Sequence, residues 1–289
     1  MAKSRHYDTR TRRSQGTQRA RQRIAPQRAA QQRARARRPF LASMAAVGAV
    51  LAIVVGFVAV KLTSGTAAAS ESVAPQSVVS QVTTVPAAVL ARVRGGGTAT
   101  SLQAVKAPGP VLSIAGKPAI VFVSEESCPF CAAERWPLVV ALSHFGTWSH
   151  LGSTRSSATD IFPNTATLSF RTAGYRSAEL TLRTTELTDN RGRRLQPLTP
   201  LDTKLLRSYD APPYVNSADQ SGAVPFLDIG NRYILAGAQY DPQVLAGLSA
   251  VQIAGQLRNP SSPAAKAIDG SANMIIAAID KVLHHQVRA

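Results

Sequence analysis

The longest apolar stretch of the chain lies near its N-terminus. Residues 40–60 form a run of 21 residues without a charge, and Lys61 ends it. At a rise of about 1.5 Å per residue, a helix of this length crosses the hydrocarbon core of a bilayer, which is about 30 Å thick. The stretch predicts one transmembrane helix over residues 39–61. A secretory signal peptide cleaved near Ala69 is the alternative, but its apolar segment usually spans about 7–15 residues.

The residues before this stretch are polar and follow neither the helical nor the strand period. Residues 1–38 consist largely of Arg, Gln and Ala, which predicts a disordered tail. They hold 13 Lys or Arg and a single acid, Asp8, so most of the chain's net charge of +17 belongs to this tail. Because positive charge marks the cytoplasmic side of a span, we expect a single-pass protein of the cell membrane with a cytoplasmic N-terminus and an extracytoplasmic C-terminal part.

A basic tail also suggests nucleic-acid binding. This tail lacks interleaved aromatic residues and any folded module, whereas a topology determinant that touches anionic lipid head groups needs only the charge. We therefore expect the membrane, through residues 40–60, and no nucleic acid as the partner of this region.

The composition changes again after the apolar stretch. Residues 62–106 are rich in Ala, Ser, Thr, Val, Pro and Gly, which predicts a flexible extracytoplasmic linker with room for one short helix at Pro86–Arg94. Residues 107–289 have the pattern of a folded α/β domain. Ala119–Val123 is continuously apolar, as a strand buried on both faces would be, and a helix is predicted from Cys128 to His144.

Alternating and β-branched residues predict further strands, and longer amphipathic stretches predict further helices. The predicted strands are Pro110–Ile114, Pro118–Val123, Thr165–Phe170, Ala178–Leu187, Val224–Ile229 and Tyr233–Ala236, and the predicted helices are Thr199–Tyr209, Asp241–Leu257 and Pro263–His285.

The chain has only two cysteines, Cys128 and Cys131, which excludes a disulfide framework and a four-cysteine zinc site. Their spacing brings both sulfurs together on one helical turn. The free N–H groups and positive partial charge of a helix N-terminus stabilise a thiolate, which is the attacking species. Pro129 suits the first helical turn, where its missing N–H costs nothing. Cys128 is therefore the predicted nucleophile and Cys131 the resolving thiol.

Two plainer explanations of the cysteine pair remain open. A zinc site would need two more ligands, and no histidine has ligand spacing to the cysteines, so we predict no metal site. The histidines are His6, His144, His150, His284 and His285. A purely structural disulfide that closes so short a loop would add little stability.

The strand at Ala119–Val123 followed by Cys128-Pro129-Phe130-Cys131 at a helix start resembles the thioredoxin superfamily, and the motif itself resembles periplasmic disulfide-exchange proteins and glutaredoxins. The string SCPFCAAERWPLVVALSHFG resembles more closely a membrane-anchored family known only as a domain of unknown function. The resemblance covers about residues 107–287. It implies a thioredoxin-like fold, with a central mixed sheet between helices, preceded by the transmembrane helix. Because 94 residues separate Cys131 from Pro225, an insertion is expected at about 148–210.

The superfamily also implies a cis-proline that faces the sulfurs. Pro225 fits, and Val224 before it would offer its backbone to the substrate, although an ordinary trans proline at a strand start is the alternative. The buried acid that many relatives carry six residues before the first cysteine is replaced by Phe122. Candidates for its proton-shuttling role are Glu134 and, after it, Glu125 and Glu126. Phe130 cannot donate a hydrogen bond to the thiolate, so we expect a less oxidising couple than the strongest periplasmic oxidants.

The resemblance implies a thiol–disulfide oxidoreductase that acts on exported proteins. It would need no organic cofactor beyond its own disulfide, and its electron partner would be a membrane thiol oxidase, plausibly quinone-linked, or a membrane thiol reductase. The motif leaves oxidase, reductase and isomerase open, because all three share this framework. Two other functions remain open: a dithiol module that carries Cu(I), which accepts sulfur ligands, and a redox-inert interaction domain.

Overall fold

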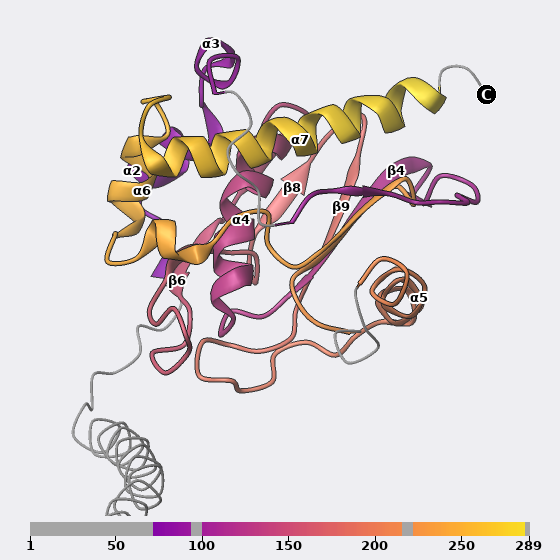
Figure 1. Cartoon of the computed structure of the whole chain (residues 1–289), viewed down its shortest axis with the longest axis horizontal. Coiled ribbons are helices and arrows are strands. Elements are labelled where there is room, and N and C mark those ends of the chain that lie inside the picture. The colour runs from indigo at the N-terminus through magenta and orange to yellow at the C-terminus, as the bar shows by residue number, and fades with distance from the viewer. Residues whose placement is uncertain (1–71, 94–99, 216–221, 287–289) are drawn as a thin grey trace, which may run out of the picture. The chain divides into compact units, whose positions relative to one another are not determined.

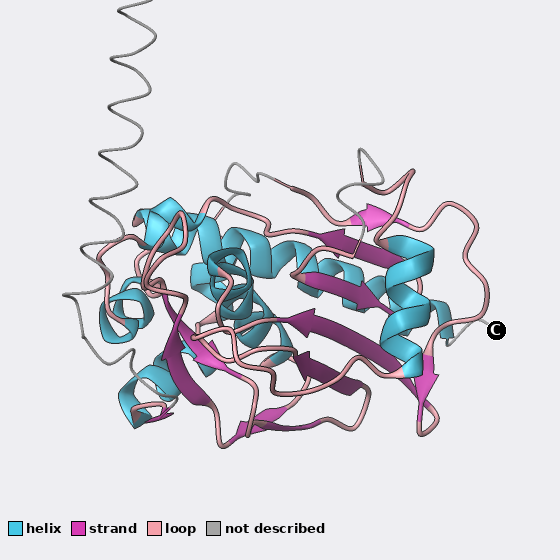
Figure 2. Ribbon diagram, turned by 90° about the horizontal axis from the view of Figure 1, so that it is seen from below, coloured by secondary structure: helices cyan, strands magenta, loops and turns pink. Residues whose placement is uncertain are grey.

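The computed structural model describes residues 72–93, 100–215 and 222–286. The basic tail, the predicted transmembrane stretch and the first part of the predicted linker lie outside these residues. Within them the chain has a mixed α/β fold, with a central mixed sheet and helices on its two faces (Figures 1 and 2). No helix in this part of the chain is both long enough and apolar enough to span a bilayer.

The central sheet is built around β4 (Lys117–Ser124). On one side β4 pairs in parallel with β9, and it also pairs antiparallel with β10, which continues through β11 to β2. The short strand β3 forms a hairpin with the start of β4. The partner strands are β2 (Gln103–Ala104), β3 (Ser113–Ile114), β9 (Thr181–Glu186), β10 (Phe226–Ile229) and β11 (Tyr233–Ala236).

The described helices agree with most of the predicted ones. Pro86–Arg94 contains a helix, though a shorter one, and the helix predicted from Cys128 begins one residue later. The helices that the structure describes are α2 (Gln76–Thr83), α3 (Ala87–Leu90), α4 (Pro129–Leu142), α5 (Pro200–Tyr209), the 3-10 helix η2 (Pro242–Leu245), α6 (Ala250–Gln256) and α7 (Pro263–Gln286).

Both faces of β4 are buried, as its continuous apolar run predicted. Successive side chains of a strand point to opposite faces. Ile120 and Phe122 pack in the larger apolar cluster with α4 and α7, whereas Val121 and Val123 pack in a smaller cluster with side chains of α5. Figure 1 shows α4 and α7 on one side of β4 and β9 and α5 on the other. Helix α4, which begins at the cysteine motif, is therefore held against the sheet by apolar packing along its whole length.

The prediction of a flexible linker over 62–106 is wrong for the residues that the structure describes. Val78 and Val82 are fully buried, and α2 packs against α4 and α6. β1 (Ser72–Val73) and β2 both pair with later strands. The Ser- and Thr-rich composition concealed an apolar stripe of residues four apart, which is a helical spacing that one face can bury. The folded part thus begins no later than Ser72, well before residue 107.

The predicted insertion at 148–210 is too wide. β9 and α5 fall inside this range, yet β9 lies beside β4 in the central sheet. Within the predicted range, four strands of the described residues stand apart from the central sheet: β6 and β7 pair with each other, with β1 added at the edge of β6, and β5 pairs with β8. These strands are β5 (Thr147–Ser149), β6 (Gly152–Arg155), β7 (Ala166–Ser169) and β8 (Gly174–Arg176).

The single helix predicted over Asp241–Leu257 is divided in two. Gly247, with a φ of 73°, follows η2 and turns the chain in a conformation that favours glycine. Ser249 then caps α6 in a capping box with Gln252. The apolar period continued across the break, which is why the pattern alone did not reveal it.

We predict that α2 contributes to the stability of the folded unit. Replacing Val78 and Val82 together by Ala removes about four buried methylene equivalents and should lower the free energy of unfolding by about 3 kcal/mol. Urea unfolding measures the change. Val73→Ala, at a side chain that is 83% exposed, is the matched control and should change it by less than about 0.5 kcal/mol. Equal effects at the buried and exposed positions would contradict the packing of α2.

Candidate active site

The two cysteines lie where the loop after β4 leads into α4. Cys128 is the N-cap of α4, and its Sγ accepts a hydrogen bond from the backbone N–H of Cys131 at 3.3 Å. Pro129 occupies the first helical turn, where no N–H is needed. Cys128 is partly exposed and Cys131 is fully buried behind it, and both are free thiols.

The surroundings separate the two thiols chemically. The hydrogen bond with the Cys131 side chain lowers the pKa of Cys128 and outweighs the effect of burial, with help from the backbone N–H groups of Cys131 and Phe130 and from the charge of Arg135. Burial, followed by the neighbouring Cys128, raises the pKa of Cys131 well above its usual range. Cys128 is thus the thiol that ionises more readily, and Cys131 is the one that holds its proton more tightly.

Pro225, the proline that the superfamily resemblance placed opposite the thiols, lies next to them. The Val224–Pro225 peptide bond is cis, as predicted. β10 begins at Phe226, which is paired with Val123 on β4, so the pairing carries Val224 to the level of the cysteine loop. The Cys128 thiol donates to the carbonyl oxygen of Val224 at 3.7 Å. The backbone of Val224 therefore lies within reach of a group bound to the Cys128 sulfur.

An ion pair beneath the thiols was missed by the sequence analysis. Arg135, one turn after Cys131, is fully buried, and its Nη2 and Nε donate to the Glu186 carboxylate at 2.6 and 3.0 Å. Ser124 Oγ donates to the same carboxylate at 2.9 Å. Burial alone would lower the pKa of Arg135, but the paired carboxylate outweighs it and raises the pKa, so the guanidinium stays charged. Its charge acts on both thiols and lowers the pKa of each.

Arg135 had a signal in the sequence, but its partner did not. An arginine inside the apolar string of α4 is unusual, since arginine is almost never fully buried unless paired. Glu186 lies 51 positions away, and only the parallel pairing of β4 with β9, which sets Ser124 opposite Glu186, brings it to the helix.

The predicted proton shuttle Glu134 has a different partner. Its carboxylate is buried and accepts the backbone N–H of Gln239 at 3.0 Å, which ties α4 to the segment after β11. Burial raises the pKa of Glu134 to about 8. Among the described residues it makes no contact with either thiol. Glu125 does touch a thiol, but through its backbone N–H, which donates to Cys131 Sγ at 3.4 Å. Glu126 is buried and accepts a hydrogen bond from Ser169.

The proline inside α4 is compensated by a tyrosine. Pro137 has no N–H to offer the carbonyl of Ala133, four residues earlier. Tyr240 donates its hydroxyl to that carbonyl at 2.7 Å, and the helix continues through Pro137. Trp136 is fully buried and donates its Nε1–H to the carbonyl of Ala166. These bonds fix the helix that carries Cys131.

Residues outside the central sheet border the thiol on one side. The segment between β6 and β7 donates the N–H of Ser157 to the carbonyl of Ser127 at 2.8 Å. Phe162, on the same segment, lies edge to face with Phe130, with 5.8 Å between ring centroids. Phe130 stays 39% exposed, so an apolar edge stands next to Cys128.

No cluster of metal-ligating side chains occurs in the part of the chain that the structure describes. The dithiol at the tip of α4 is thus the chemically distinctive group of this region.

The fold and the site define a mixed α/β protein with a reactive dithiol at a helix N-terminus, next to a cis-proline. Residues 103–281 match the model of the family described as Domain of unknown function (DUF929), and since this is more than half of the chain, the protein belongs to that family. No curated protein and no solved structure matches the chain.

We predict that Arg135 helps to keep Cys128 ionised. Replacing the whole pair, in Arg135→Met/Glu186→Leu, removes the charge without leaving an unpaired buried carboxylate. The pKa of Cys128 should rise, which ultraviolet thiolate absorbance against pH measures in the reduced protein. Arg176→Met, at an exposed arginine on β8, is the control and should leave the titration unchanged. An unchanged midpoint in the double variant would show that the ion pair does not act on the thiols.

We predict that Glu134 is protonated in the folded protein at neutral pH. Its folded pKa of about 8 lies above the unfolded value of about 4.3, so the folded state holds a proton that the unfolded state releases between these values. Wild-type stability therefore falls as pH rises through this window, by up to about 1.4 kcal/mol per pH unit from this group. Glu134→Gln cannot titrate and should gain stability relative to wild type from pH 5 to 8 in urea unfolding. A constant difference would contradict a buried neutral carboxyl.

Proposed function

We propose that the chain is a membrane-anchored thiol–disulfide oxidoreductase with a thioredoxin-like fold, which acts on exported proteins through Cys128 and Cys131. One observation carries the proposal: a partly exposed thiol of lowered pKa lies at a helix N-terminus, with a buried thiol behind it and the backbone next to a cis-proline in front of it. An inert disulfide or a packing cysteine needs none of these features.

The order of elements supports the thioredoxin-like assignment. The strands run β9-β4-β10-β11 across the sheet, with β4 and β9 parallel and the last two antiparallel. The dithiol follows β4, the cis-proline precedes β10, and α7 closes the fold. This is the arrangement that the superfamily would require around a redox-active pair.

The chemistry follows from the order of the two pKa values. The Cys128 thiolate attacks one sulfur of a substrate disulfide, forms a mixed disulfide and releases the other substrate sulfur as a thiolate, which takes up a proton. Cys131 then loses its proton and attacks the Cys128 sulfur. This step closes the Cys128–Cys131 disulfide and frees the second substrate thiol. Two electrons pass from the dithiol to the substrate, and the reverse sequence oxidises a substrate dithiol.

The buried guanidinium of Arg135 would assist the second step. Among the described residues no acidic side chain contributes to the pKa shift of Cys131, but a thiolate formed there would interact with the Arg135 charge in a low-dielectric interior. Arg135 is in this view a positioning residue that replaces the buried acid expected at Phe122. No organic cofactor enters this scheme.

The basic tail and the apolar stretch of residues 40–60 support an extracytoplasmic site for the dithiol. A membrane thiol oxidase or reductase would then restore the working redox state after each turnover.

We predict that the two cysteines have distinct roles. Cys131→Ser should accumulate a mixed disulfide with a substrate disulfide, because nothing resolves the bond at Cys128, whereas Cys128→Ser should form none. Mass spectrometry of the alkylated protein after exposure to oxidised glutathione counts the adducts. Equal adduct formation by both variants would contradict the assigned nucleophile.

The reduction potential of the wild-type protein, measured against a glutathione series, tests the proposal and its direction. A value above about −180 mV would mark a donor of disulfides, and a value near −270 mV a reductant. We expect a value below about −120 mV, since the side chain of Phe130 cannot donate a hydrogen bond to the thiolate. The absence of any redox transition would overturn the proposal. Stoichiometric Cu(I) binding would then favour a copper module, and full cellular activity of a variant without both cysteines would favour a redox-inert interaction domain.

A further inference from the structure

A pocket of about 490 Å³ adjoins the thiol loop. Its walls come from Glu125 on one side and from the hairpin that follows β9 on the other, including Leu187, Thr188, Arg194 and Leu198. The hairpin is ordered by backbone bonds: the N–H of Leu195 donates to the carbonyl of Leu187, and Thr188 and Arg194 form an antiparallel bridge. The pocket therefore has fixed walls.

The hairpin that lines the pocket is hydrogen-bonded to the residues that precede Cys128. The N–H of Glu126 donates to the carbonyl of Thr188 at 3.0 Å, and the N–H of Leu187 donates to the carbonyl of Ser124 at 2.8 Å. The hydroxyls of Ser127 and Thr188 lie 3.0 Å apart. Leu187 also packs in the same apolar cluster as Val224. The pocket thus borders the loop that leads to Cys128.

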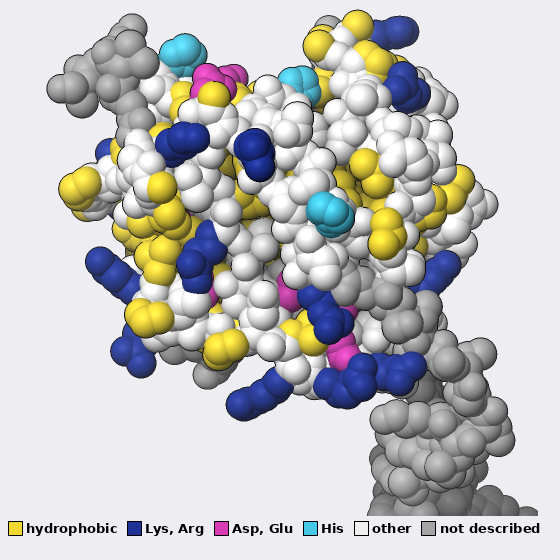
Figure 3. All heavy atoms as spheres, turned by 180° about the vertical axis from the view of Figure 1, so that it is seen from behind, with side chains coloured by type: hydrophobic (Ala, Val, Ile, Leu, Met, Phe, Trp, Pro, Cys, Tyr) yellow, Lys and Arg dark blue, Asp and Glu magenta, His cyan; other side chains and the backbone are white. Residues whose placement is uncertain are grey.

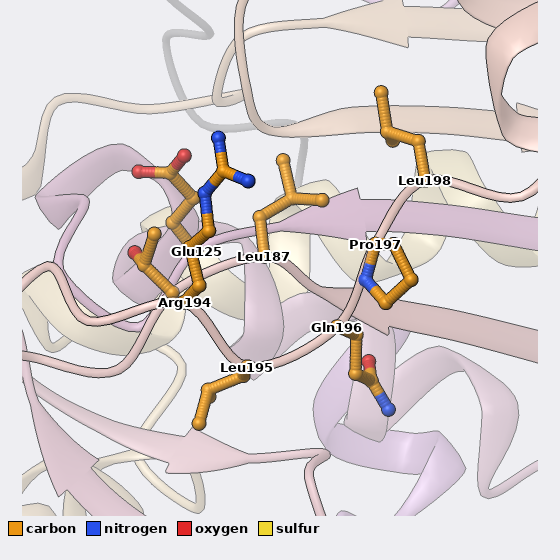
Figure 4. Close-up of a pocket in the computed structure, with 8 residues that line it drawn as sticks. Glu125, Leu187, Arg194, Leu195, Gln196, Pro197 and Leu198 are labelled. Carbon is orange, nitrogen blue, oxygen red and sulfur yellow. The ribbon is translucent and has the colours of Figure 1, made fainter.

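The two ends of the pocket differ in chemistry. Figure 4 shows the side chains of Glu125 and Arg194 together at one end, Pro197 and Leu198 at the other, and Leu187 between them. Leu198 is 40% exposed, so its side chain offers apolar surface at that end of the pocket.

The charged end can bind an acidic group. Arg193 on the same turn is paired with Asp189 at 2.6 Å, whereas Arg194 is exposed and has no ion-pair partner among the described residues. On the face that Figure 3 shows, Lys and Arg side chains are spread widely and Asp and Glu side chains are few. Glu125 lies at the same end, but its carboxylate accepts a hydrogen bond from the Ser127 hydroxyl at 3.2 Å, so the guanidinium of Arg194 is the charge that is available to a ligand.

We propose that this pocket binds the substrate polypeptide beside its reacting cysteine, and that it selects an extended segment with an apolar residue followed by an acidic one. The apolar side chain packs on Leu187 and Leu198, and the acidic side chain pairs with Arg194. The proposal rests on the proposed thiol–disulfide activity and adds its substrate class. An extended chain fits because the charged end and the apolar end lie apart, with Leu187 between them (Figure 4).

Mixed disulfides between short cysteine peptides and a chromogenic aromatic thiol test this specificity. One peptide carries Leu and then Glu on each side of its cysteine, and a second carries Leu and then Lys. The reduced full-length protein in detergent releases the thiol, and the dependence on peptide concentration gives the half-saturation concentration and the maximal rate. We expect the Glu peptide to saturate at a concentration about fivefold lower than the Lys peptide.

Variants assign the effect to the pocket. Arg194→Glu should reverse the preference between the two peptides, and Leu198→Ser should raise the half-saturation concentration for both by about tenfold, through lost apolar contact. Neither should alter the maximal rate. Arg176→Glu makes the same charge change outside the pocket and should leave all values unchanged.

The outcomes separate this proposal from the one on which it rests. Reaction with the symmetric disulfide of the chromogenic thiol needs only Cys128, so failure there would overturn the oxidoreductase function itself. Normal reaction with that disulfide, together with equal saturation by both peptides or no response to Arg194→Glu, would overturn the pocket proposal alone. Equal changes in Arg194→Glu and Arg176→Glu would indicate a general charge effect and would also overturn it.

Discussion

The burial of β4 on both faces is the constraint from which the rest of this structure follows. Ile120 and Phe122 require cover from α4 and α7, and Val121 and Val123 require it from the side of α5. With both faces covered, the carboxyl end of β4 is the place where the chain emerges and turns into α4. Cys128 stands at that turn because it is the residue that caps the helix. The position of Cys128 thus depends on apolar packing more than on any polar contact.

The polar contacts around the two thiols then shift the pKa values of these thiols. An Arg–Glu pair inside the core is costly to bury and contributes little to stability by itself, so its location one turn below Cys131 suggests a chemical role. The guanidinium of Arg135 provides a fixed positive charge near both sulfurs, but it cannot accept a proton. Glu134, by contrast, is held neutral by burial and links α4 to the segment beyond β11. Two adjacent ionisable residues of one helix therefore have different roles, because they face different neighbours.

Much of the central fold was predictable from local patterns. The strand at Ala119–Val123, the helix that starts at the cysteines and the hairpin before and after Gly230 all have strong periodic or turn signals, and each is found. The errors lie where the pattern was weak or interrupted. Residues 76–83 have few large apolar side chains, yet two valines four positions apart are enough to bury α2 against α4 and α6. β9 was assigned to an insertion, since linear spacing does not tell which strands share a sheet.

The sequence by itself determined the dithiol and its place at a helix N-terminus, because these depend on short spacings and on the conformational limits of single residues. The proline opposite the dithiol was expected from the superfamily resemblance and not from spacing. Only the tertiary structure decided which charges reach the thiols. Glu186, Gln239 and Leu187 lie more than 50 residues from the helix or loop positions that they contact, and strand pairing and helix packing bring them there. Electrostatic fields and pockets depend on such distances in space, to which the order of residues along the chain gives no direct access.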